Sequence, residues 1–187
     1  MKKSNSKISL IIPLFNIEEE WDNFFVNKYY DSLIELPIEV FIINDCSTDN
    51  SLVLLNSIEN DKIKILNNDS NKGPNFSRNI GIQNSSSEYL LFLDSDDKLN
   101  IDSLKKILRN EKFINYDVLS FSFSFENLNN KVLKFYYHLS FNEKQNHFSK
   151  YLLGKYYRVS WGRLYKKEFL KINNIKFIED KIHVVQN

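Results

Sequence analysis

Two aspartates stand one residue apart directly after an apolar run, where Tyr89–Leu93 is followed by Asp94-Ser95-Asp96. Two carboxylates this close repel each other at neutral pH unless a positive charge lies between them. Carboxylate oxygens suit Mg²⁺ and Mn²⁺, which commonly use one or two carboxylates together with substrate phosphates. The alternative is a plain turn in which an aspartate caps a helix that starts at Ile101. The position after an apolar strand favours the metal.

Other polar residues also follow apolar runs. Asn16 comes after the first run of the chain, and Asp45 comes after the second. The carboxyl ends of parallel strands lie on one edge of a sheet, and ligands bind in the crevice outside that edge. We therefore expect Asn16, Asp45, Asp94 and Asp96 to converge on one rim. For Asp45 alone, an Asx-turn is the alternative.

Basic residues and glycines lie between the third and fourth apolar runs. Lys72 and Arg78 are placed to face phosphates, and the alternative for both is a solvated helix face. Gly73 and Gly81 are two of only four glycines in the chain, so each is expected to meet a backbone requirement.

The elements that would position these residues alternate in kind. Short, nearly continuous apolar runs predict strands at Ile8–Ile12, Val40–Ile43, Ile63–Leu66 and Tyr89–Leu93. Helical spacing predicts helices at Glu18–Leu36, Ser51–Asn60, Phe76–Asn84 and Ile101–Asn110. Strand and helix in alternation indicate an α/β fold with a mostly parallel central sheet and helices on both faces.

The second half of the chain has a different pattern. Ser120–Phe125 alternates with period two, and Val132–Leu139 follows an asparagine-rich turn, so the two predict a smaller antiparallel strand pair. Helices are predicted near Glu143–Leu153 and Lys166–Ile172. Ile175–Ile178 predicts one more strand. Because this strand ends near Asn187, a sequence that is cut short at its C-terminus is left open.

Composition limits the class of protein. The chain has 187 residues, which suits a single domain. A net charge of +1 argues against a nucleic-acid partner. Cys46 is the one cysteine, so no intramolecular disulfide can form and a reducing compartment is expected. The apolar run near the N-terminus is too short for a signal peptide, and no transmembrane segment is predicted. We expect a cytoplasmic protein, with peripheral attachment to the inner face of the membrane left open.

Four segments together resemble a known family. They are Ile11–Asn16, Asn44–Asp49, Asn71–Gly81 and Phe92–Asp97. Their order and spacing across residues 7–100 are similar to those of family 2 glycosyltransferases of the GT-A fold. A weaker similarity continues at Trp161–Lys166. Cys46 departs from the pattern, because the family usually has glycine there, and this leaves the local turn open.

The resemblance implies an activity. Such enzymes move a sugar from a nucleotide diphosphate sugar, here most simply a UDP-sugar, to an acceptor hydroxyl with inversion. A Mn²⁺ or Mg²⁺ ion on the diphosphate would stabilise the leaving group. The implied acceptor is a glycan or a lipid-linked molecule, and the implied process is the synthesis of a bacterial surface polysaccharide. Residues 1–100 would bind the nucleotide-sugar, and residues 101–187 would face the acceptor.

The resemblance also implies roles for single residues. Those expected to line the nucleoside pocket are Pro13, Phe15 and Asn16, with Asp45 at the base. Asn71 and Lys72 are expected near the base or the phosphates, and Asp94 and Ser95 at the nucleotide. Asp96 is the expected metal ligand, together with Asp94.

A catalytic base is expected on the acceptor side. The family usually supplies it from a Glu-Asp pair, and Glu179-Asp180 is the pair present here. Two alternatives remain: the pair is a plain surface turn, or the base lies beyond Asn187. His183 is either a third metal ligand or a structural residue.

Two other functions compete with a transferase. A phosphohydrolase would use an Asp-x-Asp nucleophile, but that fold places its aspartates after the first strand and not the fourth. A degenerate nucleotide-sugar binding module would keep Asp45, Asp94 and Asp96 and lack a working base. Turnover of the donor separates the enzyme from the binding module.

Overall fold

The computed structural model describes residues 6–21, 29–58, 60–97, 99–109, 116–120, 123–126, 132–135 and 162–179. The strands are β1 (Ile8–Leu14), β2 (Ile38–Asn44), β3 (Ile63–Asn67), β4 (Tyr89–Phe92), β5 (Val118–Ser120), β6 (Phe123–Glu126), β7 (Val132–Phe135) and β8 (Arg163–Lys166). The helices are α1 (Tyr29–Ile34), α2 (Ser51–Asn56), α3 (Pro74–Asn84), α4 (Ile101–Arg109) and α6 (Lys167–Ile172).

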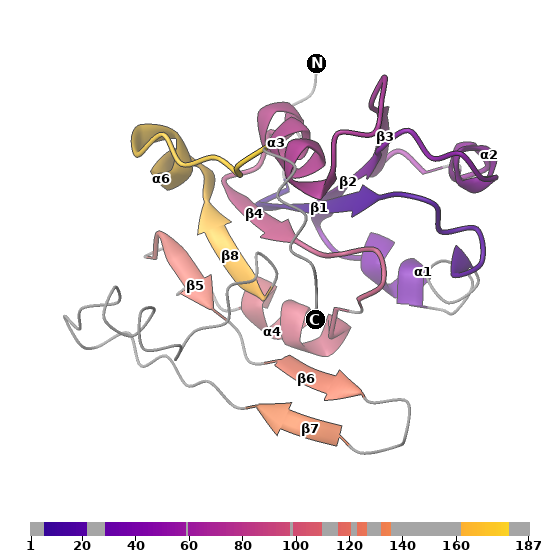
Figure 1. The fold of residues 1–187 in the computed structure, drawn as a ribbon. Coiled ribbons are helices and arrows are strands. Elements are labelled where there is room, and N and C mark those ends of the chain that lie inside the picture. Colours follow the sequence, from indigo (N-terminus) through magenta and orange to yellow (C-terminus); the bar gives the residue numbers. More distant parts are fainter. Residues whose placement is uncertain are drawn as a thin grey trace.

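Six strands form one sheet in the order β3-β2-β1-β4-β8-β5, and β6 pairs with β7 separately (Figure 1). The strands from β3 to β4 run parallel, with Ile11 opposite both Phe41 and Phe92. β8 then runs antiparallel to both β4 and β5. This is the predicted mixed α/β fold, and its parallel part brings the carboxyl ends of β2, β1 and β4 to a single edge.

The central strands are buried on both faces, which explains their continuous apolar sequences. On one face, Ile11 and Phe41 pack with Leu170 of α6 and with side chains of α3. On the other, alternate residues of β1 and β2 pack with Leu33 of α1 and Leu104 of α4. The helices therefore cover the sheet from both sides, as Figure 1 shows.

The predicted smaller antiparallel pair is confirmed, because β6 pairs with β7. The alternating stretch Ser120–Phe125 is nevertheless divided: Ser120 ends β5 in the large sheet, and Phe123–Phe125 belong to β6 in the small one. β8 was not predicted, because only Leu164 of its four residues is buried and no apolar run marks it. β8 lies between β4 and β5, and its backbone donors and acceptors can form hydrogen bonds with both strands. Such a short strand can form with little apolar sequence.

Ile175–Ile178 is not a strand. Its backbone runs as a coil beside α3, and the side chains of Asn75 and Asn79 take the hydrogen bonds that a neighbouring strand would have made. Of the helix predicted at Glu18–Leu36, residues 18–20 form a turn, Trp21 and Tyr29–Ile34 are helical, and residues 22–28 lie outside the described part. The helix predicted near 143–153 lies outside it as well.

No helix in the described part of the chain is long and apolar enough to cross a membrane.

Candidate active site

The acidic residues after β4 form a tight turn at the carboxyl edge of the sheet. The amide of Asp97 donates to the carbonyl oxygen of Asp94 at 3.0 Å and closes the turn. Asp96 is exposed, while Asp94, Ser95 and Asp97 are half-buried. The aspartate cap considered for α4 is wrong, because Asn100 fills that role: its Oδ1 accepts from the amide of Ser103 at 2.8 Å.

The turn concentrates negative charge. Burial and, to a smaller extent, the charges of Asp96 and Asp94 together raise the pKa of Asp97 to about 6. This carboxyl belongs to the site although the sequence analysis assigned it no role. The third acidic residue in the Asp94–Asp97 run was the signal that could have found it.

Arg78 of α3 supplies the positive charge that pairs with this turn among the described residues. Its Nη2 donates to Asp94 Oδ1, and its Nη1 donates to Asn75 Oδ1 at 2.8 Å. The guanidinium also lies over the ring of Phe177, 5.5 Å from the centroid. Arg78 is buried, so the solvated-face alternative is wrong for it. Its Nε has no hydrogen-bond partner among the described residues. The ion pair with Asp94 compensates the charge of the buried guanidinium.

Asp45 is buried, with 3% of its surface exposed, and it organises the loop that leads into α3. Its Oδ1 accepts from Asn68 Nδ2 at 2.6 Å and from the Lys72 amide at 3.0 Å. Its Oδ2 accepts from the Gly73 amide at 2.6 Å, and Gly73 has the positive φ of +87° that only glycine adopts easily. The Asx-turn alternative is wrong for Asp45, because its neighbour Asn44 accepts from the Ser47 amide instead.

The loops after β1 and β2 are tied to each other. The amide of Asn16 donates to Ser47 Oγ at 3.0 Å, and Asn16 Oδ1 accepts from the Thr48 amide at 2.8 Å. Asn16 therefore holds the two loops together at the rim. Phe15 beside it is 43% exposed, whereas Pro13 is buried inside β1.

Lys72 lies in the loop before α3 and not on a helix face. Its Nζ pairs with Asp69 Oδ1 at 2.5 Å and lies 4.6 Å from the centroid of the Phe76 ring. Asn71 next to it is exposed. Both residues belong to the loop before α3 that Asp45 anchors.

Glu179 reaches the same helix from the far end of the chain. Its Oε1 accepts from Asn79 Nδ2 at 2.7 Å. Asp180 and His183 lie outside the described residues. Sequence reasoning assigned no role to Asn68, Asn75 or Asn79, although Asn79 stands beside Arg78 in a segment that carries the resemblance.

The predicted rim therefore forms. Asn16, Asp45 and the Asp94–Asp97 turn follow three adjacent parallel strands. Gly73, which caps the start of α3, contacts Asp45, and Arg78 of α3 contacts Asp94. Within the described part of the chain, no group of three or more His, Cys, Asp or Glu side chains could hold a metal ion. Asp94 and Asp96 nevertheless fit a cation whose remaining ligands are phosphate oxygens and water.

Comparison with known proteins adds an independent observation. The profile of the family described as "Glycosyl transferase family 2" matches residues 9–172. The chain belongs to this family. The matched range contains the whole rim and both strands at the β4–β8 junction. The prediction of a glycosyltransferase is confirmed at the level of the family.

Several glycosyltransferases are similar to this chain in sequence. An uncharacterized glycosyltransferase of Haemophilus influenzae is 35% identical over 106 residues, which are 54% of this chain and 40% of the relative. Glycosyltransferase GlyA of Streptococcus pneumoniae is 28% identical over 178 residues, which are 87% of this chain and 25% of GlyA. This chain thus spans less than half the length of either relative.

The fold is also similar to that of solved transferases. The crystal structure of residues 1–349 of Staphylococcus aureus TarS has a TM-score of 0.69 and 26% identity, over 93% of this chain and 51% of that chain. The same part of TarS in complex with UDP-GlcNAc has a TM-score of 0.68 and 26% identity, over 92% and 48% of the two chains. These similarities confirm the GT-A type of architecture for this family 2 chain.

Proposed function

We propose that this chain moves a sugar from a nucleotide diphosphate sugar to an acceptor hydroxyl, with inversion at the anomeric carbon. A UDP-sugar is the proposed donor, because TarS has been crystallised with UDP-GlcNAc. The proposed acceptor is a glycan or a lipid-linked molecule of bacterial surface polysaccharide synthesis. The relative TarS of Staphylococcus aureus is named a poly(ribitol-phosphate) β-N-acetylglucosaminyltransferase, which supports this choice.

One observation carries the proposal: Gly73, the residue that caps the start of α3, bonds to Asp45, and Arg78 within α3 bonds to Asp94. One rigid element thereby fixes the loop at the end of β2 relative to the acidic turn at the end of β4. A nucleotide diphosphate has a base and a pair of phosphates that must be held at a fixed separation. The exposed ring of Phe15 and the loop around Asn71 and Lys72 would receive the nucleoside, with Pro13 and Asn16 shaping the rim beneath it.

Asp96, together with Asp94, would hold a Mn²⁺ or Mg²⁺ ion. Such an ion neutralises charge on the departing diphosphate when it is bound. The raised pKa of Asp97, about 6, indicates how strongly burial and the neighbouring Asp96 and Asp94 disfavour another negative charge in this turn. A cation at Asp96 would relieve that repulsion. Ser95 would lie at the nucleotide side of the same turn.

Asp180 is the proposed base, with Glu179 beside it in the chain. A single in-line displacement needs a group that takes the proton from the acceptor hydroxyl as attack proceeds. Residues 1–100 would then form the donor half of one domain, and residues 101–187 the acceptor half. The pairing of β8 with β4 supports the placing of both halves in one domain, because it joins the second half to the central sheet.

Calorimetric titration with UDP tests the donor site. Wild type should bind UDP in Mn²⁺, and EDTA or the substitution Asp96→Asn should weaken binding by about tenfold or more. Asp102→Asn is the matched control, since Asp102 is an exposed aspartate in the first turn of α4, and it should leave the affinity unchanged. Equal affinities in Asp96→Asn and wild type would contradict the metal role.

Release of UDP from a panel of UDP-sugars tests the reaction. Wild type should hydrolyse at least one donor slowly, and Asp180→Asn should lose this turnover while it keeps its affinity for UDP. UDP binding without turnover of any donor or transfer to any acceptor would favour the degenerate binding module instead.

A further inference from the structure

Asn79 on α3 makes an unusual set of contacts with the segment that follows α6. Its Nδ2 donates to the carbonyl oxygen of Phe177 at 2.9 Å, and its Oδ1 accepts from the amide of Phe177 at 3.0 Å. The same Nδ2 donates to Glu179 Oε1 at 2.7 Å. Asn79 is only 4% exposed, so these bonds are shielded from water. One side chain therefore substitutes for a neighbouring strand and reaches a carboxylate two residues further on.

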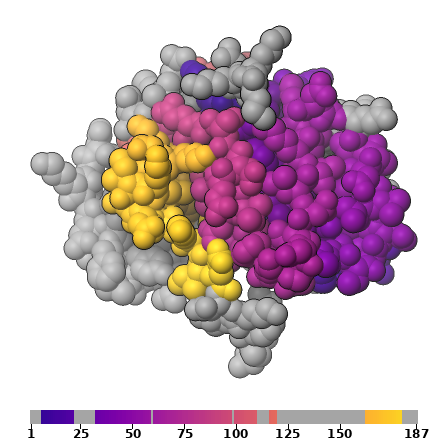
Figure 2. Space-filling view, turned by 90° about the horizontal axis from the view of Figure 1, so that it is seen from above, coloured from indigo at the N-terminus to yellow at the C-terminus, as the bar shows by residue number. Residues whose placement is uncertain are grey.

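A second asparagine extends this attachment. Asn75 lies one helical turn before Asn79, and its Nδ2 donates to the carbonyl oxygen of Ile178 at 2.8 Å. The two asparagines thus fix consecutive peptide units of the segment along one side of α3. Figure 2 shows the yellow part of the chain, residues 162–179, lying against the magenta part that contains α3.

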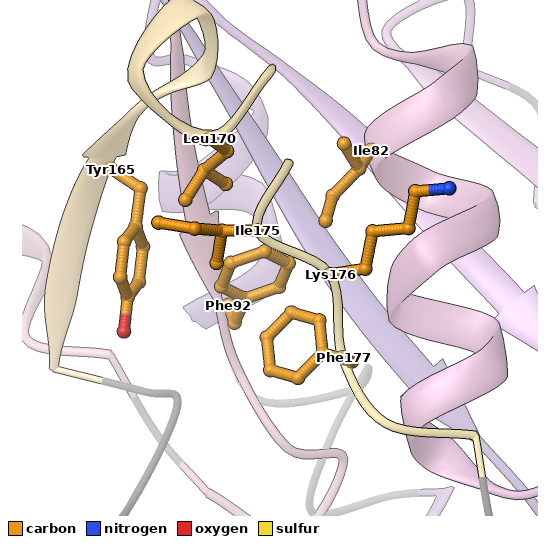
Figure 3. A pocket seen from close by; sticks show the side chains of 7 residues that line it. All are labelled: Ile82, Phe92, Tyr165, Leu170, Ile175, Lys176 and Phe177. Atoms are coloured by element: carbon orange, nitrogen blue, oxygen red, sulfur yellow. The ribbon is translucent and has the colours of Figure 1, made fainter. Parts of the chain in front are cut away.

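Residues 175–178 also pack on the central sheet. The ring of Phe177 packs edge to face on Phe92 of β4, with 5.0 Å between the ring centroids. Figure 3 shows Phe177 and Ile175 turned toward Phe92, with the chain passing between α6 and α3. The same ring lies under the guanidinium of Arg78. Phe177 therefore contacts both residues of α3, Arg78 through its ring and Asn79 through its backbone.

Arg78 and Asn79 connect α3 to two different groups of carboxylates. Arg78 bonds to Asp94 in the acidic turn, and Asn79 bonds to Glu179. The helix is itself seated closely on the sheet, because Gly81 approaches the side chain of Ile11. A rigid helix that is attached at both points holds the two groups at a constant separation.

We propose that Asn79 is a positioning residue that holds Glu179, the first residue of the Glu179-Asp180 pair, at a fixed place relative to α3 and the acidic turn. Its bonds hold residues 177–179, the last described residues before Asp180 in the chain. The inference rests on the proposed function, in which this pair acts on the acceptor hydroxyl. Asn79 does not touch substrate in this role, and it acts only through the segment that it holds.

The role predicts a separation of turnover from nucleotide affinity. Loss of Asn79 should loosen residues 177–179 and displace the pair, and small displacements of a reacting group lower rates by one or two orders of magnitude. The bond between Gly73 and Asp45 and the bond between Arg78 and Asp94 do not involve the Asn79 side chain. Binding of UDP should therefore be maintained.

The experiment compares Asn79→Ala with Asn84→Ala in the full chain. Asn84 is a matched control, because it lies on the same helix and its Nδ2 donates only within that helix, to the Ile80 carbonyl oxygen. Asn79→Asp is a second variant, which keeps the acceptor for the Phe177 amide but replaces the donor by a charge next to Glu179. Three quantities are measured: deuterium exchange in residues 175–179, the Kd for UDP with Mn²⁺, and kcat for the UDP-sugar that wild type hydrolyses fastest.

Both Asn79 variants should exchange faster in residues 175–179, lose about tenfold or more in kcat and keep the Kd for UDP within about threefold. Asn84→Ala should match wild type in all three. Unchanged exchange in Asn79→Ala, or faster exchange with wild-type kcat, would overturn the inference and leave the proposed function intact. A parallel loss of UDP affinity would also overturn it, since the residue would then be part of the nucleotide site or of the general fold. A wild-type protein with no turnover would overturn the proposed function and the inference with it.

Discussion

Arg78 and Asp94 form an ion pair between a buried helix residue and the first residue of the acidic turn. The side chain of Arg78 is 9% exposed and that of Asp94 is 33% exposed, so water screens the pair only from the side of Asp94. The pair connects α3 to the end of β4 at the rim. Within the described residues, Arg78 is the one positive charge paired with the turn that contains Asp94, Asp96 and Asp97.

Replacement of Arg78 by methionine should therefore destabilise the fold. The substitution keeps most of the volume but leaves three neighbouring carboxylates without a cation, and we expect a loss of about 2 kcal/mol in the free energy of unfolding. Lys72→Met is the control, because the pair of Lys72 with Asp69 is exposed and should contribute below about 0.5 kcal/mol. Urea denaturation measures both. Similar losses in the two variants would mean that burial does not strengthen the Arg78 pair.

Glu39 on β2 provides a pH test at the opposite edge of the sheet. It is 3% exposed, and it accepts from Ser9 Oγ at 2.5 Å, from Lys64 Nζ at 3.0 Å and from the amides of Ser86 and Ser87 at 2.9 and 3.1 Å. Burial alone would raise the pKa of this carboxyl, but the hydrogen bonds from Ser9, Ser86, Lys64 and Ser87 outweigh it and lower the pKa to about 2 from 4.5.

A carboxyl whose pKa is lowered by folding stabilises the protein above its unfolded pKa and loses that contribution as the pH falls. Here the window runs from about pH 5 down to pH 2, and the contribution is about 3 kcal/mol. The free energy of unfolding of wild type should fall more steeply across this window than that of Glu39→Gln. Glu88→Gln, an exposed control, should follow wild type. Parallel acid limbs for wild type and Glu39→Gln would contradict the prediction.

The rim could be predicted from sequence because parallel strands leave no choice about direction. Once β1, β2 and β4 are recognised as buried strands, Asn16, Asp45 and Asp94 must lie at one edge. Their partners could not be predicted in the same way. Asp45 bonds to backbone amides 27 and 28 residues away, and only the packing of α3 on the sheet determines which amides come near.

The segment at 175–178 shows a different limit. Its alternating apolar residues are typical of a strand, but a strand needs a free edge with backbone donors and acceptors. In the fold the segment lies beside α3 on a face of the sheet, where Asn79 supplies one donor and one acceptor instead. Sequence periodicity describes which side chains can be buried, and it says nothing about which edge is available.

Gly81→Ala should destabilise the contact between α3 and the sheet. A Cβ at position 81 would overlap Ile11 Cγ2 and come within 3.0 Å of Ile11 Cγ1. Ile11 is fully buried in β1, so its side chain has little room to move, and overpacking of this kind costs about 1–3 kcal/mol. Thermal and urea denaturation measure the loss.

Ile11→Ala tests the cause of that loss. Combined with Gly81→Ala, it removes Cγ2, Cγ1 and Cδ1 of Ile11, the three atoms that the new Cβ would meet, so the double variant should lose less stability than the sum of the single variants. Additive losses would show that the destabilisation by Gly81→Ala does not come from contact with Ile11.

Cys46→Gly should stabilise the protein. Cys46 has a φ of +59°, in the left-handed region where a residue with a Cβ is strained by roughly 1–2 kcal/mol. Glycine relieves this strain but gains freedom in the unfolded chain, so the expected net gain in the free energy of unfolding is about 0.5–1 kcal/mol. Asn174→Gly is the matched control: Asn174 has a φ of +50°, but asparagine tolerates this conformation, and the change should be close to zero. Urea denaturation under reducing conditions measures both variants, and a loss of stability in Cys46→Gly would show that packing of the thiol outweighs the strain of the turn.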